Sequence, residues 1–98
     1  VEAFNFIALY NGQCVGTARY RIIGAGTKLE RFAVLNSYRN LGIGKLLVNF
    51  LKNLLINEKN VYLHAQEQVV DFYIKLGFIK VGKRFYEAGV PHYKLHRL

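Results

Sequence analysis

Apolar and polar residues alternate through the first third of the chain. The alternation predicts three strands near residues 3–10, 14–23 and 28–35. Asn11-Gly12 lies between the first two strands and is typical of a two-residue hairpin turn. Gly24-Ala25-Gly26 marks the second turn, so the three strands form an antiparallel meander. Cys14 is expected to be a small buried residue of the second strand.

Helical spacing replaces the alternation beyond the third strand. Leu47, Leu51, Leu54 and Leu55 recur on one side, which predicts an amphipathic helix of about 15 residues. A short strand follows at 60–65, and EQVVDFYIKLGF (67–78) predicts a second helix that ends at Gly77. Residues 78–98 return to strands, with a turn around Glu87–Pro91. The expected order is β-β-β-α-β-α-β-β.

This order determines the expected fold class. The first helix joins strands 28–35 and 60–65, so these two strands are parallel while the first three are antiparallel. We therefore expect an α/β fold with a mixed sheet. With 98 residues, the chain is expected to form a single domain over 1–98.

Composition and charge narrow the possible partners. The single cysteine and the absence of a signal-peptide pattern favour a reducing, cytoplasmic setting. No apolar run is long enough to predict a membrane span. A net charge of +8 suits an anionic partner, either a nucleic acid or a phosphorylated cofactor. The basic residues are spread along the chain and no aromatic pair follows an RNA-binding strand pattern, so nucleic acid is disfavoured. His64, His92 and His96 lack metal-ligand spacing, so no metal is expected.

The stretch SYRNLGIGKLL (37–47) lies between a strand and a helix and contains two glycines. A helix N-terminus presents free N–H groups to an anion, Gly42 and Gly44 would let a phosphate approach, and Arg39 and Lys45 add charge. A turn without any ligand is the alternative. Known phosphate motifs do not match, because a P-loop needs glycine at 39 and serine or threonine at 46, and a dinucleotide fingerprint needs a small residue at 47.

Arg39-x-x-Gly42-x-Gly44 resembles the Arg/Gln-x-x-Gly-x-Gly/Ala signature of the GNAT superfamily, the acyl-CoA-dependent N-acyltransferases. LERFAVLNSYRNLGIGKLL (29–47) looks like the whole strand-loop-helix motif of that family. FYIKLGF (72–78) resembles its later FYxKxGF motif, at the expected distance. The resemblance runs from about residue 3 to the end. It implies a GNAT-like fold that lacks the family's N-terminal strand and helices.

The resemblance also implies a site. A β-bulge would open the sheet for the pantetheine arm of acetyl-CoA, which would bind main-chain groups of Phe32, Ala33 and Val34. The loop and first helical turn would hold the pyrophosphate with the amides of Arg39, Asn40, Leu41, Gly42, Ile43, Gly44 and Lys45. In the family, polar groups commonly follow strand 60–65, where this chain has Gln66, but Val69 replaces a usual asparagine.

Two residues are candidates for the chemistry. Tyr73 would protonate the departing thiolate, and Phe72 beside it would lie in the core; alternatively Tyr73 only packs. Glu30 would remove the amine's proton, directly or through water; alternatively it is a surface glutamate paired with a cation. Strict alternation would put Glu30, Phe32 and Val34 on one face.

The remaining roles are also implied by the resemblance. The Val34 amide would bind the oxyanion. The turn EAGVPHY (87–93) carries Glu87 and His92 and could line the acceptor pocket, with His92 structural or acceptor-facing rather than a base.

The predicted function is N-acetyl transfer from acetyl-CoA to a primary amine by direct attack in a ternary complex. The alternative is a non-catalytic module that binds CoA or a nucleotide, or a degenerate acetyltransferase domain. The partners would be a CoA thioester and an unidentified amine acceptor, with a homodimer left open.

Overall fold

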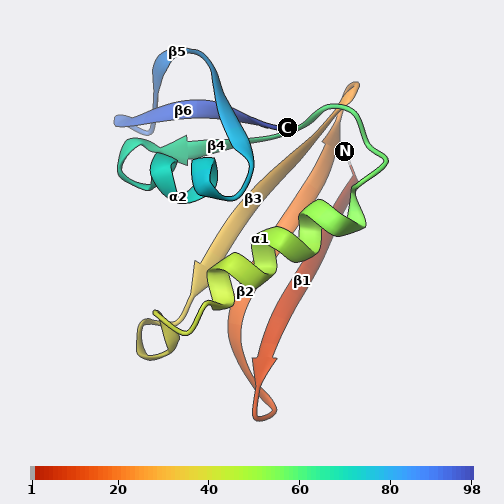
Figure 1. Cartoon of the computed structure of the whole chain (residues 1–98), viewed down its shortest axis with the longest axis vertical. Helices are drawn as coiled ribbons and strands as arrows, with labels where there is room; N and C mark the ends of the chain where they lie inside the picture. The colour runs from red at the N-terminus through yellow and green to blue at the C-terminus, as the bar shows by residue number, and fades with distance from the viewer. Residues whose placement is uncertain (1) are drawn as a thin grey trace.

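The computed structural model describes residues 2–98 and has the predicted order of elements (Figure 1). Its strands and α-helices are β1 (Glu2–Tyr10), β2 (Gln13–Ile23), β3 (Gly26–Val34), α1 (Ile43–Leu54), β4 (Val61–Gln66), α2 (Val70–Lys75), β5 (Phe78–Glu87) and β6 (Val90–Arg97). Short 3-10 segments, Asn36–Tyr38 and Glu67–Val69, lie before the two helices. The Asn11-Gly12 turn and the helix end at Gly77 are both present, with positive φ angles at all three residues.

The six strands form one mixed sheet in the order β1-β2-β3-β4-β6-β5. The predicted parallel pair is confirmed, but it is short, because only Thr27–Leu29 of β3 pair with Val61–Leu63 of β4. Beyond these residues the two strands separate, and Figure 1 shows the rest of β3 running away from β4. The sheet therefore opens in its middle, between two well-paired halves.

Helix α1 lies across the half of the sheet made by β1, β2 and β3 (Figure 1). Its buried side consists of Ile43, Leu47, Val48 and Leu51. Leu54, which was expected on that side, is the last residue of the helix and is 50% exposed; Val48 takes its place in the core. At 12 residues α1 is shorter than expected. No helix within residues 2–98 is both long enough and apolar enough to cross a membrane.

Glycine at position 16 permits the close approach of α1 to β2. A Cβ atom there would lie 3.1 Å from Leu47 Cδ1 and 3.3 Å from Ile43 Cγ2, which is tighter than ordinary packing. Gly16 therefore marks the face of β2 that α1 covers. By strand alternation, Ala18 and Tyr20 lie on the same face.

Two β-bulges interrupt the alternation on which the sequence prediction relied. In the first, Ala8 pairs with Gly16 while Leu9 pairs with Cys14, so Val15 is an extra residue. Val15 is buried and Cys14 is exposed, so the prediction that Cys14 is buried was wrong. In the second, Arg19 pairs with Glu30 but Thr17 pairs with Ala33, so β3 carries one extra residue there. Arg31 lies in this bulge, with a φ angle of +58°.

Candidate functional site

A cleft of about 1110 Å³ opens where β3 and β4 diverge. Residues of β2, β3, β4 and α2, the loop before α1 and the β5–β6 hairpin all contribute to its walls. Its charges are strongly unequal, since six cations, Arg19, Arg21, Lys28, Arg31, Arg39 and Lys45, face two carboxylates, Glu30 and Glu87. The cleft therefore attracts an anionic ligand.

The N-terminus of α1 lies at one end of this cleft. The first-turn amides of Ile43, Gly44 and Lys45 have no carbonyl partner within the helix. No side chain caps this end and no acidic residue lies in its first turn. Lys45 is there instead, although a helix N-terminus favours negative charge. The local sequence thus leaves positive charge at this helix end for an anion to neutralise.

Glycine occurs at the two positions of this loop, 42 and 44, for different physical reasons. Gly42 precedes the helix in the left-handed region, with a φ angle of +79°, where a side chain is strained. Gly44 has no such need. A Cβ there would lie 3.7 Å from Phe72 Cζ and 3.9 Å from Val34 Cγ2, which are ordinary contacts. The fold therefore requires glycine only at 42, and the missing side chain at 44 widens the cleft.

Arg39 ties this loop to the end of β3. Its Nε donates a hydrogen bond to the Val34 carbonyl oxygen at 3.2 Å. The structure brings nearly all predicted cofactor-binding residues to the cleft walls: Phe32, Ala33, Val34, Arg39, Asn40, Gly42, Ile43, Gly44 and Lys45. Leu41 is the exception, because it is exposed and is not part of the wall.

The bulge at Arg31 changes which side chains share a face. Val34 pairs with Gly16, so Val34 and Phe32 lie on the side of the sheet that α1 covers. Glu30 pairs with Arg19 and lies on the opposite side. The expectation that Glu30, Phe32 and Val34 share one face was wrong, because the extra residue reverses the alternation. The cleft therefore connects the two sides of the sheet.

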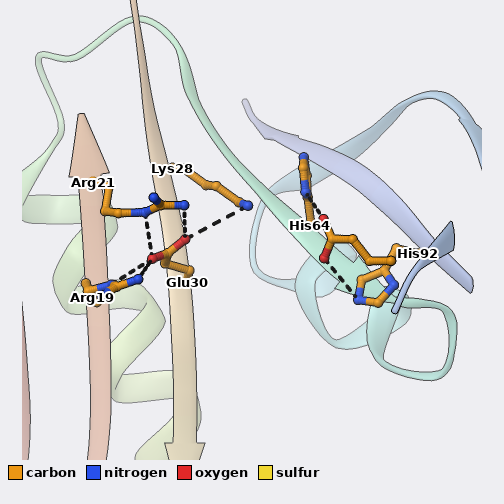
Figure 2. Close-up of polar contacts among 7 residues, drawn as sticks. Arg19, Arg21, Lys28, Glu30, His64 and His92 are labelled. Carbon is orange, nitrogen blue, oxygen red and sulfur yellow. Dashed lines mark hydrogen bonds and ion pairs between the residues drawn. The ribbon is translucent and has the colours of Figure 1, made fainter. Parts of the chain in front are cut away.

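Glu30 is surrounded by cations (Figure 2). Arg19 Nε donates to its Oε2 at 2.7 Å, Arg21 Nη2 donates to its Oε1 at 3.0 Å, and Lys28 Nζ lies 3.9 Å from Oε1. Burial raises the pKa of Glu30, but the hydrogen bonds and charges of Arg21 and Arg19 outweigh it and leave this pKa below its ordinary value. The carboxylate therefore holds its negative charge firmly.

Tyr73 has a ring that packs against other aromatic rings and a hydroxyl that is accessible from the cleft. The ring lies 6.1 Å from that of Phe32 and 5.9 Å from that of Phe78, and the residue is 9% exposed. Within residues 2–98 the hydroxyl makes no hydrogen bond, yet it is not fully enclosed, and Tyr73 lines the cleft. Burial raises the pKa of Tyr73 to about 12, so the phenol stays protonated at neutral pH. Phe72, expected in the core, is 41% exposed and lines the cleft beside Gly44.

A second polar group faces the Glu30 cluster across the opening between β3 and β4 (Figure 2). It consists of His64 on β4, Glu87 on β5 and His92 on β6. Glu87 Oε1 lies 2.7 Å from His64 Nδ1, and Oε2 lies 3.6 Å from His92 Nε2. Glu87 and His92, which the sequence predicted to line an acceptor pocket, both line this cleft.

His64 was missed as a site residue by sequence reasoning. It alternates with Gln66 along β4, and both line the cleft. Two polar side chains on one face of an otherwise apolar strand were the available signal. Gln66 Oε1 accepts a hydrogen bond from Gln68 at 2.7 Å. Among residues 2–98, no group of three or more His, Cys, Asp or Glu side chains is arranged to hold a metal ion.

Comparison with known families and proteins gives a consistent result. The family model described as Acetyltransferase (GNAT) domain matches residues 2–97. Two Bacillus subtilis (strain 168) proteins are similar in sequence: YyaT, an uncharacterized protein, is 40% identical over 91 residues, and YjcF, an uncharacterized N-acetyltransferase, is 36% identical over 93 residues. These matches cover 90% and 91% of this chain but only 61% and 66% of the two relatives.

Solved structures share the fold. An acyl-CoA N-acyltransferase from Pseudomonas aeruginosa superimposes with a TM-score of 0.86 at 21% identity, covering all of this chain and 70% of that one. A GNAT family acetyltransferase from Elizabethkingia anophelis with acetyl-CoA bound has a TM-score of 0.73 at 17% identity, covering 94% of this chain and 71% of that one.

Proposed function

The chain belongs to the GNAT acetyltransferase family, and from this premise we propose that it transfers an acetyl group from acetyl-CoA to a primary amine by direct attack in a ternary complex. One observation carries the proposal. The cleft between the diverging strands β3 and β4 joins an uncapped, positively charged helix N-terminus to an open tyrosine hydroxyl. The helix N-terminus would bind the phosphates of a CoA thioester. The tyrosine hydroxyl would donate a proton to the departing thiolate.

The cofactor would lie along one continuous segment. The pyrophosphate would bind the amides of residues 39–45, with Arg39 and Lys45 beside it. The pantetheine arm would follow the main chain of residues 32–34, whose β4 side has no paired strand. An extended chain that bonds to an open strand edge is an established mode of recognition. Leu41 would contribute only its backbone amide, since its side chain lies outside the cleft wall.

The acetyl transfer would take place in the cleft, where the two sides of the sheet connect. The neutral amine nitrogen attacks the thioester carbonyl carbon, and the Val34 amide would stabilise the oxyanion. The C–S bond then breaks, and the Tyr73 hydroxyl would give its proton to the sulfur. A pKa of about 12 keeps this hydroxyl protonated at neutral pH, but it also makes the hydroxyl a weak acid toward a thiolate. Its help would be modest, because a thiolate is already a good leaving group.

Removal of the amine's proton is the remaining requirement. An alkylamine with a pKa of about 10.4 is almost entirely protonated at pH 7. Glu30 stays the predicted base, but two observations weigh against it. Its carboxylate is bound by Arg19 and Arg21, and its pKa is lowered, which makes it a weaker base than an ordinary glutamate.

The non-catalytic alternative shares the cofactor site and differs only in turnover. Isothermal titration with acetyl-CoA tests binding, and affinity should fall as salt rises because phosphates face cations. Release of free thiol with a panel of primary amines tests turnover. Binding without turnover for any amine would favour the alternative. Thermal stabilisation by a single-stranded oligonucleotide but not by acetyl-CoA would refute both.

A further inference from the structure

Glu87 and two histidines form a polar cluster that the proposed mechanism has not used. His64 Nδ1 lies 2.7 Å from Glu87 Oε1, within hydrogen-bond distance. His92 Nε2 is 3.6 Å from the other carboxylate oxygen, too far for a hydrogen bond. All three side chains line the cleft. Glu87 is therefore bonded to His64 and only electrostatically coupled to His92.

This bond determines which nitrogen of His64 is free. The hydrogen bond from His64 lowers the pKa of Glu87; burial raises it, and the charges of His64, Lys28 and His92 lower it further. The ionised carboxylate can only accept, so His64 Nδ1 is the donor. Nε2 then carries the lone pair of the neutral ring, and within residues 2–98 it makes no hydrogen bond. A carboxylate that orients a histidine in this way is the arrangement used by general bases.

His92 is held differently. Its Nδ1 lies 2.8 Å from the Val90 carbonyl oxygen, to which it must donate. Its ring stacks on Phe85, with centroids 5.9 Å apart, and the residue is 8% exposed. His92 is thus fixed by its own hairpin, whereas His64 is fixed by a carboxylate.

The strand register places His64 on the face of the sheet opposite α1. Leu29 pairs with Leu63 on the buried face, so Lys28 and Tyr62, which also pair, lie on the other face. His64 is two residues after Tyr62 and shares that face, as does Glu30. The helix N-terminus that would hold the cofactor lies on the opposite side of the sheet.

We propose that His64 is the general base for the acceptor amine and that Glu87 is its positioning residue, an inference that rests on the proposed acetyl transfer. His64 Nε2 removes one proton from the acceptor ammonium and passes it to solvent. The neutral nitrogen forms the C–N bond and the C–S bond breaks. Tyr73 gives a proton to the sulfur and is reprotonated by the second proton that the nitrogen loses. The sum is an amide, free CoA and one proton released.

Several ionisable groups surround His64 and would influence how the reaction rate depends on pH. Tyr62 lies beside it on β4, with ring centroids 5.8 Å apart. Lys94 pairs with it from β6, and Glu87 and His92 complete the cluster. Lys28 and Glu30 are on the adjoining strand β3. Lys94 Nζ lies over the Tyr62 ring at 4.7 Å, so the nearby cation is already engaged.

The tautomer is tested without any acceptor. Long-range proton–nitrogen NMR on the 98-residue chain should show His64 protonated at Nδ1, and Glu87→Gln should remove that preference. His96→Gln is the matched control, because His96 bonds to the Arg97 carbonyl and lies outside the cleft wall. A His64 ring protonated only at Nε2 would overturn the proposal, since no lone pair would then face the amine.

Kinetics test the role itself. With acetyl-CoA and glycinamide, His64→Gln should lower kcat/KM at pH 7 about 10²-fold. It should also abolish the rise of rate with pH that a general base produces. Glu87→Gln should reduce the rate at least tenfold without changing acetyl-CoA affinity. His92→Gln should retain the rise. Loss of that rise in His92→Gln but not in His64→Gln would overturn the assignment.

The two levels of inference fail in different ways. If wild-type protein turns over no amine in the panel, including glycinamide, the proposed acetyl transfer fails, and with it the role of His64 as base. If the wild type is active and His64→Gln is equally active while remaining folded by circular dichroism, only the inference about His64 fails.

Discussion

The two walls of the cleft are built in different ways. The proposed cofactor wall lies within one continuous segment, residues 32–45, and would act mainly through backbone amides and through glycine. The polar wall takes His64, Glu87, His92 and Glu30 from four different strands and would act through side chains. A backbone site depends on local conformation, whereas a side-chain site depends on strand register.

This difference predicts how the two walls respond to mutation. Changes to the proposed cofactor wall should alter binding, because its groups would contact a part of the ligand that does not react. Changes near the reacting atoms should alter turnover at constant binding, because only interactions that strengthen in the transition state raise kcat. Three experiments examine this comparison, in order of expected effect.

Tyr73→Phe should lower kcat by up to about 10²-fold while leaving acetyl-CoA affinity unchanged. The ring keeps its contacts with Phe32 and Phe78, so stability should change little. Steady-state kinetics with an accepted amine, together with isothermal titration, measures both quantities.

Tyr86→Phe is the matched control for this experiment, because Tyr86 is exposed and outside the cleft wall. Equal kcat for Tyr73→Phe and wild type would leave Tyr73 as a packing residue. Loss of acetyl-CoA affinity with kcat unchanged would indicate that Tyr73 binds the cofactor and does not take part in the chemical step.

Gly44→Val should weaken acetyl-CoA binding at least tenfold, because a side chain would occupy the space that a phosphate needs. The protein should stay folded, because valine suits a helix better than glycine does and a Cβ atom at position 44 meets only ordinary contacts. Gly42→Val is a poorer test, since its positive φ angle adds strain to any steric effect. Unchanged affinity in folded Gly44→Val would contradict the pyrophosphate assignment.

The smallest expected effect concerns Glu30 and acid stability. Its pKa is lowered in the folded protein, so its contribution to stability is complete above the unfolded pKa and is lost as pH falls through the folded pKa. Wild type should therefore lose more Tm than Glu30→Gln when pH is lowered from 7 to 3. If wild type and Glu30→Gln lose the same amount of Tm over this pH range, the contacts of Glu30 with Arg19 and Arg21 add no net stability.

Local sequence signals were sufficient for most of the fold and for the position of the loop that lines one end of the cleft. Asn11-Gly12 and Gly77 predicted a hairpin and a helix end, because their positive φ angles suit few other residues. The motif at Arg39–Lys45 predicted the family, which is confirmed, as is the mixed α/β sheet with its one parallel pair. Each of these features depends on a few neighbouring residues.

The errors arose where one strand met another. A bulge at Val15 exposed Cys14, and a bulge at Arg31 moved Glu30 to the face opposite Phe32. Neither can be read from a single strand, because a bulge is a mismatch in length between two paired strands. Leu54 was expected to be buried from periodicity, but it is half-exposed at the end of α1. Phe72 was expected in the core beside Tyr73, but it lines the open cleft instead.

The sequence by itself determined the order of elements, the family and the place of the glycine loop between a strand and a helix, since turn residues, periodicity and a contiguous motif act over short distances. Only the tertiary structure decided which side chains meet across the cleft. The His64–Glu87 pair joins residues 23 positions apart, on strands β4 and β5, which are held together through β6. Its 2.7 Å separation depends on two antiparallel registers at once, and no pattern along the chain encodes such a sum.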